Sequence, residues 1–160
     1  MKKLNLAAAK HPFLSSLDPG DAERLLEHAV QKTFSAGEII FREGEPANSL
    51  YLIESGKVAL ETHAPGENPV QIEKLGSGDV LGWSWLFPPF AWHLQARATE
   101  PTRALVCDGA NLLIQSEEDN TFGYRLMKQV AQVVIQRLQA TRTRLLESRR
   151  AGEYYATHTT

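Results

Sequence analysis

The sequence is poor in cysteine, in long apolar runs and in excess charge of either sign. Its single cysteine, Cys107, excludes an intrachain disulfide and a cysteine-based metal cluster, and it suits a reducing compartment. The formal net charge of −2 argues against strong nonspecific attraction to nucleic acid or to an anionic membrane. No segment approaches the roughly 18 apolar residues that a membrane-spanning helix needs. We therefore expect a cytoplasmic protein with no membrane contact.

The sequence also lacks the residue patterns of an enzyme or of a metal site. Its 5 histidines are scattered and do not follow the spacing of metal ligands. We find no phosphate-binding loop, no pair of catalytic carboxylates and no Ser-His-Asp order. We therefore expect a protein that is not an enzyme, with no catalytic residue, no metal and no cofactor.

What the sequence does contain is the pattern of one domain, residues 1–150, in three parts. Residues 1–31 have the apolar spacing of helices, and residues 109–150 return to that spacing. Between them, residues 33–107 alternate polar and apolar side chains in short segments that glycines separate, which is typical of an antiparallel sandwich or barrel. The predicted fold is α+β: an antiparallel, jelly-roll-like β-roll with N-terminal helices and a long C-terminal dimerisation helix. Residues 151–160 are predicted to form a flexible tail.

The last helical part carries a narrow stripe that consists mostly of apolar residues. The stripe recurs every three or four positions and consists of Met127, Val130, Val134, Leu138, Thr141 and Leu145. Polar residues such as Lys128, Gln132 and Arg142 lie between them. A narrow stripe of this kind on a long helix needs a partner. It could pack on the β-roll, on a second copy of the chain or on both, and we expect a homodimer through residues 121–150.

The segment GWSWLFPPFAWH, residues 82–93, contains all 3 tryptophans of the chain and a Pro-Pro pair. Two interpretations are open. Large aromatic side chains often serve as core. A cluster of aromatic rings with a few polar groups, here Ser84 and His93, also matches the lining of a ligand pocket.

Two stretches, FSAGEIIFREGEPANSLYLIESGKVAL and GSGDVLG, resemble the cyclic-nucleotide-binding domain family, which includes bacterial catabolite activators, kinase regulatory subunits and gated channels. The following residues fall on the family pattern: Gly37, Gly44, Tyr51, Ile53, Gly56, Val58, Gly78, Asp79 and Gly82. The segment RLQATR, residues 137–142, is similar to the dimer helix of the bacterial activators. The resemblance implies a β-roll with a regulatory role.

The segment after Gly82, which we call the cassette (residues 82–93), departs from this family. In the family, the N-terminus of a short helix binds the cyclic phosphate, a glutamate holds the ribose hydroxyl, and an arginine pairs with the phosphate. Here Trp83 stands at the glutamate position, and Trp92 or His93 stands at the arginine position. An indole donates one hydrogen bond and accepts none. We therefore expect that cyclic AMP and cyclic GMP are not bound in the usual way.

Two residues of the long helix complete the candidate ligand site. The resemblance implies that Thr141 lies where the activators place a threonine against the base, and that Arg137 matches an arginine that reaches the cassette. Arg137 could stack on Trp83 in a cation–π contact or remain a solvated helix residue. The candidate ligand-binding residues are Gly82, Trp83, Ser84, Trp85, Leu86, Trp92, His93, Arg137 and Thr141.

The sequence thus predicts a stand-alone regulatory module that senses a small molecule, either nucleotide-like or aromatic, and signals to a separate, unidentified protein partner. A ligand-free scaffold with a degenerate pocket is one alternative, and a cyclic nucleotide binder with a non-standard cassette is another. Bacterial activators continue after the dimer helix with a helix-turn-helix domain, whereas here only residues 151–160 follow, so we expect no direct DNA binding.

Overall fold

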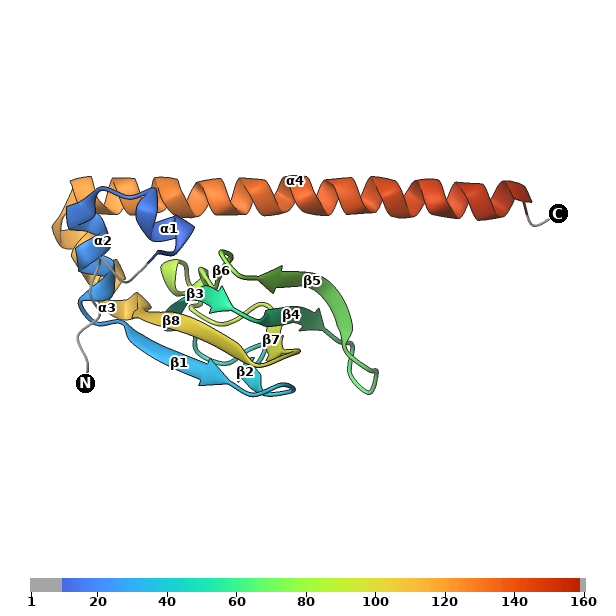
Figure 1. The fold of residues 1–160 in the computed structure, drawn as a ribbon, viewed down its shortest axis with the longest axis horizontal. Helices are drawn as coiled ribbons and strands as arrows, with labels where there is room; N and C mark the ends of the chain where they lie inside the picture. The colour runs from blue at the N-terminus through green and yellow to red at the C-terminus, as the bar shows by residue number, and fades with distance from the viewer. Residues whose placement is uncertain (1–9, 159–160) are drawn as a thin grey trace. The chain divides into compact units, whose positions relative to one another are not determined.

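The β-roll predicted from the alternating segments is present. The computed structural model describes residues 10–158, with side chains up to residue 152. Within that range, the strands form two four-stranded antiparallel sheets in the orders β1-β8-β3-β6 and β2-β7-β4-β5, which is the jelly-roll pattern (Figure 1). The strands are β1 (Val30–Phe34), β2 (Ile39–Phe41), β3 (Ser49–Ser55), β4 (Lys57–Thr62), β5 (Val70–Gly76), β6 (Val80–Leu81), β7 (Gln95–Ala98) and β8 (Thr102–Asp108).

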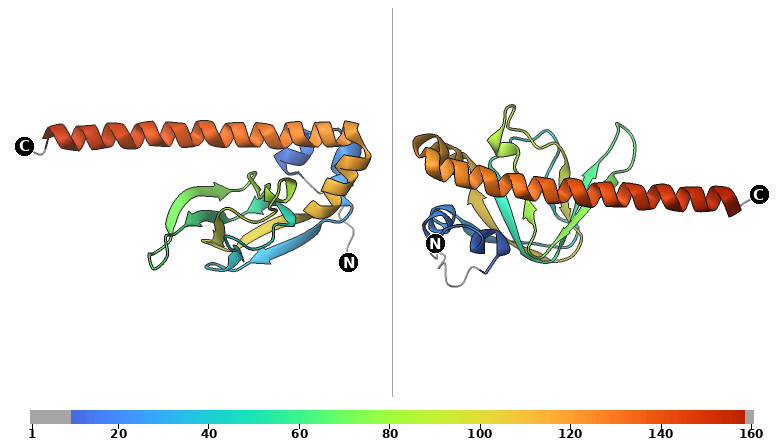
Figure 2. Two further views of the ribbon diagram at one scale, coloured as in Figure 1. Left: turned by 180° about the vertical axis from the view of Figure 1, so that it is seen from behind. Right: turned by 90° about the horizontal axis from the view of Figure 1, so that it is seen from above.

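The core of the roll lies between the two sheets, which face each other in the views of Figure 2. Alternate side chains of β4, Val58 and Leu60, are buried there, together with Ile53 from β3 and Ala96 from β7. Successive side chains of a strand point to opposite faces, so alternate positions of β4 reach this core together. Ala59 and Glu61, on the other face of β4, are also buried. The tight connection from β3 to β4 requires a glycine, because Gly56 has φ +100°.

The helices flank the roll in sequence on both sides. They are α1 (Pro12–Ser15), α2 (Pro19–Leu26), α3 (Gly109–Glu118) and α4 (Asn120–His158), and the short 3₁₀ helix η2 (Ser84–Leu86) lies between β6 and β7. Asp108 caps α3 by accepting a hydrogen bond from the N–H of Asn111 at 3.0 Å.

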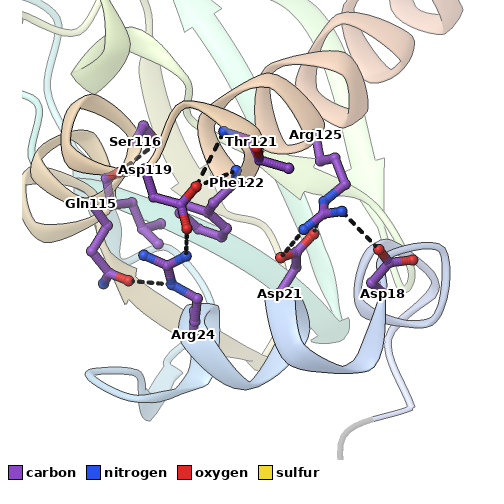
Figure 3. Close-up of polar contacts among 10 residues, drawn as sticks. Asp18, Asp21, Arg24, Gln115, Ser116, Asp119, Thr121, Phe122 and Arg125 are labelled. Atoms are coloured by element: carbon purple, nitrogen blue, oxygen red, sulfur yellow. Dashed lines mark hydrogen bonds and ion pairs between the residues drawn. The ribbon is translucent and has the colours of Figure 1, made fainter.

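Arg24 holds α2 against the corner between α3 and α4 (Figure 3). It donates to Gln115 Oε1 and to Asp119 Oδ2, both at 2.8 Å, and its guanidinium lies 4.0 Å from the centroid of the Phe122 ring. Asp119 accepts the backbone N–H of Phe122, and this bond and Arg24 lower the pKa of its carboxyl group. The corner is tight because a Cβ at Gly123 would lie 2.7 Å from the Ser116 carbonyl oxygen.

The described residues divide into two units, one up to Gln129 and one from Val130 onward. The second unit is the remainder of α4. Val130 at its start is 6% exposed, whereas five apolar residues further along are exposed: Val134 (38%), Ile135 (53%), Leu138 (68%), Leu145 (69%) and Leu146 (47%). Neither α4 nor another helix within residues 10–158 is both long and apolar enough to span a membrane.

Two predicted boundaries differ from the structure. β1 begins at Val30, before the predicted start of the strands at residue 33. The predicted flexible tail is helical as far as His158, because α4 continues through residue 150 without a break. Apart from Gly152, this segment has no strong helix-breaking residue, and adding a residue to an existing helix is far easier than starting one. Residues 1–9 of the predicted N-terminal helices and residues 159–160 of the tail lie outside the described residues.

Candidate functional site

The cassette leaves strand β6 and forms one 3₁₀ turn before it changes direction. The 3₁₀ helix η2 ends at Leu86, and Phe87 is extended. The N–H of Phe90 then donates to the Phe87 carbonyl at 2.9 Å, which closes a turn around the cis Pro88–Pro89 bond. The short helix that the family resemblance implies is therefore reduced to a single turn in this chain.

Trp92 is a core residue of the β-roll. Its side chain is 5% exposed and stacks on Phe41, with ring centroids 3.8 Å apart and an angle of 11° between the planes. Tyr51 lies on the same cluster, at 6.3 Å from Trp92. The indole also covers Gly82, where an added Cβ would lie 2.7 Å from Trp92 Cη2. Gly82 has φ +91°, so both the backbone and the packing require glycine there.

Trp85 is likewise buried, at 1% exposure. Its indole N–H donates to the Gly82 carbonyl at 3.1 Å. Its ring lies against the start of α3, because a Cβ at Gly109 would be 2.7 Å from Trp85 Cγ. Leu86 is buried beside it in sequence. For Trp85, Leu86 and Trp92, the structure therefore agrees with the core interpretation that the sequence left open.

The accessible part of the cassette is smaller than the sequence suggested. Trp83 and Ser84 are half-buried, and His93 is exposed. Ser84 Oγ and His93 Nδ1 are 3.2 Å apart and share a hydrogen bond. An indole, a hydroxyl and an imidazole can stack on a flat ligand and exchange hydrogen bonds with it, but they provide no permanent positive charge.

Comparison with known proteins identifies the fold and its family. The family described as cyclic nucleotide-binding domain matches residues 31–118, more than half of the chain. The chain belongs to the cyclic nucleotide-binding domain family. A crystal structure of a Geobacter metallireducens protein described as cyclic nucleotide-binding is 31% identical with a TM-score of 0.71, and the match covers 80% of this chain and 92% of that one.

Two curated bacterial proteins share part of this sequence. A Rhodopseudomonas palustris protein described as a potassium channel protein is 33% identical over 104 residues, 65% of this chain and 25% of its own length. A CRP-like protein, Clp, of Xanthomonas campestris is 32% identical over 72 residues, 45% of this chain and 31% of its own length. The matches thus span between a quarter and a third of these relatives, which are far longer.

In this family member, the first arginine after the cassette is bound to a carboxylate. Arg97 on β7 donates to Glu61 Oε1 at 3.0 Å and to Glu61 Oε2 at 2.8 Å, and Gln95 donates to the same carboxylate at 3.3 Å. The Arg97 hydrogen bonds are the main reason that the pKa of Glu61 lies below its ordinary value, although burial opposes them. The alternating sequence pattern does not predict that Glu61 is buried. In the segment VALET, residues 58–62, no local feature indicates that the glutamate pairs with an arginine of another strand.

The remaining candidate residues lie on α4 in the second unit. Thr141 Oγ1 accepts a hydrogen bond from Arg144 Nη2 at 3.2 Å within the same helix. The predicted contacts of Arg137 and Thr141 with a ligand remain predictions. Cys107 is fully buried, which raises the pKa of its thiol to about 12. No cluster of metal-ligating side chains occurs among the residues that the structure describes.

Proposed function

We propose that this chain is a regulatory module of the cyclic nucleotide-binding domain family that does not bind cyclic AMP or cyclic GMP in the usual way. One observation carries this proposal: Trp92, which with His93 is one of the two residues that the resemblance sets against the phosphate-binding arginine, is buried and stacked on Phe41. An indole in the core offers no charge to a cyclic phosphate. Without the charged partner, the ligand loses an interaction whose removal costs about 2–5 kcal/mol.

Among the described residues of the cassette and of β7, no other cation is well placed to take over this role. Within residues 82–94, His93 is the only side chain that can become positively charged. Arg97 follows on β7, but a phosphate would have to compete with the Glu61 carboxylate, which is 6% exposed. If Arg97 turned toward a phosphate instead, the buried Glu61 carboxylate would keep only its hydrogen bond from Gln95. Breaking the pair in this way would lower the stability of the folded protein.

If the domain senses a small molecule, the cassette suits an effector of a class other than cyclic nucleotides best. Trp83, Ser84 and His93 provide one aromatic face and two hydrogen-bonding groups that reach the surface. These groups suit a flat, uncharged or weakly charged molecule, nucleotide-like or aromatic. If no such molecule binds, the domain acts as a scaffold that a partner protein recognises.

We further propose that the chain works in the cytoplasm as a homodimer joined through residues 121–150, and that it signals to a separate protein partner. The support is the row of exposed leucines and other apolar residues on α4, from Val134 to Leu146. A row of this kind is stable in water when a second helix covers it.

A thermal-shift screen tests the proposal with cyclic nucleotides, linear nucleotides and aromatic metabolites. A ligand that binds only the folded state raises the melting temperature. We expect no shift with either cyclic nucleotide and, for a sensor, a shift with one other class that is lost in the double variant S84A/H93A. The matched control is S35A, an exposed serine between β1 and β2. A shift that survives in S84A/H93A would contradict the assignment of these residues, and no shift with any compound would favour the scaffold.

A further inference from the structure

His11 links the start of α1 to the turn that precedes the cassette. The side chain belongs to the residue just before α1 and is 5% exposed. Nδ1 accepts the backbone N–H of Phe13 at 3.1 Å, and Nε2 lies 3.1 Å from the Asp79 carbonyl oxygen, to which its N–H donates. One ring nitrogen therefore accepts and the other donates. This combination is available only to the neutral imidazole with its proton on Nε2.

The turn that receives this bond leads directly into the cassette. Besides the His11 proton, the Asp79 carbonyl accepts the N–H of Ile53 at 3.0 Å, and Gly78 donates to the Ile53 carbonyl at 2.9 Å. The ring of Pro12 packs on the same turn, where a Cβ at Gly78 would lie 3.5 Å from Pro12 Cγ. β6 and Gly82 follow at once, so the start of α1 packs on the segment that positions the cassette.

The N-terminal helices also contact the first turns of α4. Arg125 lies 3.3 Å from Asp18 and 2.7 Å from Asp21, and Figure 3 shows its guanidinium between the two carboxylates. Gln129 donates to Ser16 Oγ at the end of α1. α1 and α2 therefore connect the turn before the cassette with the beginning of α4, all within the first unit.

We propose that His11 is an acid-sensitive switch, in which protonation breaks the cap of α1 and releases its start from the turn formed by residues 76–79. A proton on Nδ1 would point at the Phe13 N–H, so that two donors face each other. The cap bond is then lost, and the buried ring carries a positive charge. Release of α1 would loosen both the turn before the cassette and the contacts of α1 and α2 with α4.

The surroundings of His11 favour the neutral form near neutral pH. Burial lowers the pKa of His11 from its ordinary value of 6.5, and the hydrogen bond to the Asp79 carbonyl and the charges of Glu54 and Asp79 oppose this effect. Glu54 faces the ring from β3 and Asp79 faces it from the turn, whereas α1 contributes no charged side chain. Because the folded-state pKa is lowered, the stability that His11 contributes is complete above 6.5 and is lost as the pH falls below that value.

Hydrogen exchange and NMR of the full chain test this switch. We would titrate the His11 ring by its nitrogen shifts and measure amide exchange at about pH 7.5 and about pH 5.5, corrected for the intrinsic effect of pH. We expect His11 to titrate below 6.5. We also expect the amides of Phe13 to Leu17, Ile53 and Gly78 to exchange at least about threefold faster at the lower pH. Amides of β4 and β7 should not change.

The variant H11N separates the switch from general acid effects. Asparagine is a good N-cap whose oxygen can replace Nδ1 as the acceptor, but its side chain does not titrate. In H11N, the extra exchange at low pH should disappear, whereas H28N, which changes an exposed histidine of the same region, should behave like the wild type. The proposal is overturned if His11 titrates at or above 6.5, or if the wild type and H11N respond equally to acid. Because the ring titration needs only the wild type, the proposal stays testable even if H11N does not fold.

Discussion

Gly82 can be tested against a second glycine of nearly the same backbone conformation. Gly82 and Gly37 have φ +91° and +87°, but an added Cβ meets Trp92 at position 82 and nothing within 4 Å at position 37. We predict that G37A costs about 1 kcal/mol through backbone strain alone. We predict that G82A costs about 1–3 kcal/mol more because the Trp92 ring must move. Urea unfolding of both variants measures the difference. Equal losses would show that Trp92 yields easily and does not close the cassette.

The sequence of the cassette predicted a segment that is either core or pocket, but it did not predict whether each tryptophan ring points into the core or toward the surface. Three tryptophans around a Pro-Pro pair predicted that residues 82–93 form either core or pocket. Trp92 is core because it meets Phe41, and Trp85 is core because Gly109 leaves space for it. Both partners come from distant strands or helices. The spacing of residues along the chain carries no information on such contacts. The sequence alone therefore could not tell which cassette residues belong to the core and which are available to a ligand.

At the scale of elements, β4 and β7 are joined by a partly buried ion pair whose effect depends on pH. Arg97 and Gln95 of β7 stabilise the ionised form of Glu61, which lowers its pKa below 4.5 in the folded protein. The unfolded chain therefore binds the proton first as the pH falls, and the stabilisation from this pair is present above 4.5 and is lost below it.

We predict that the variant E61Q lacks this contribution to acid unfolding. Urea midpoints measured from about pH 7 to about pH 3 should fall less steeply below 4.5 in E61Q than in the wild type. The matched control is E73Q on β5, a glutamate for which no ion pair occurs among the described residues. If E61Q and the wild type lose stability in parallel, the Arg97 pair does not influence acid stability.

The elements themselves could be predicted more completely than their contacts. Alternating side chains and glycine turns predicted the strands, because the two-residue period of a strand is a local property. The end of α4 was placed too early: residues 151–160 were predicted to form a tail, yet a helix that is already formed continues easily. The contacts of Arg24 and Arg125 between α2, α3 and α4 were not predicted. The paired residues lie about a hundred positions apart in the sequence, and the sequence alone does not indicate which distant charges form pairs.

At the scale of the whole molecule, the exposed apolar residues of α4 predict a dimer. Light scattering behind size-exclusion chromatography should give twice the chain mass of 17.8 kDa for the wild type. The double variant L138E/L145E should give the mass of one chain, because two charges would face each other across the interface of the two helices. Q139E is the matched control, since it adds charge on another face of α4 and should leave the dimer intact. A monomeric wild type at all concentrations would contradict this assembly.

Isothermal titration of the wild type with cyclic AMP and with cyclic GMP is the most direct test of the proposal that this domain does not bind these nucleotides in the usual way. We predict no saturable binding up to about 1 mM nucleotide, which corresponds to a binding free energy weaker than about −4 kcal/mol. A catabolite activator protein titrated under the same conditions provides the positive control. Saturable binding of either nucleotide with a Kd in the micromolar range, about −8 kcal/mol, would contradict the account.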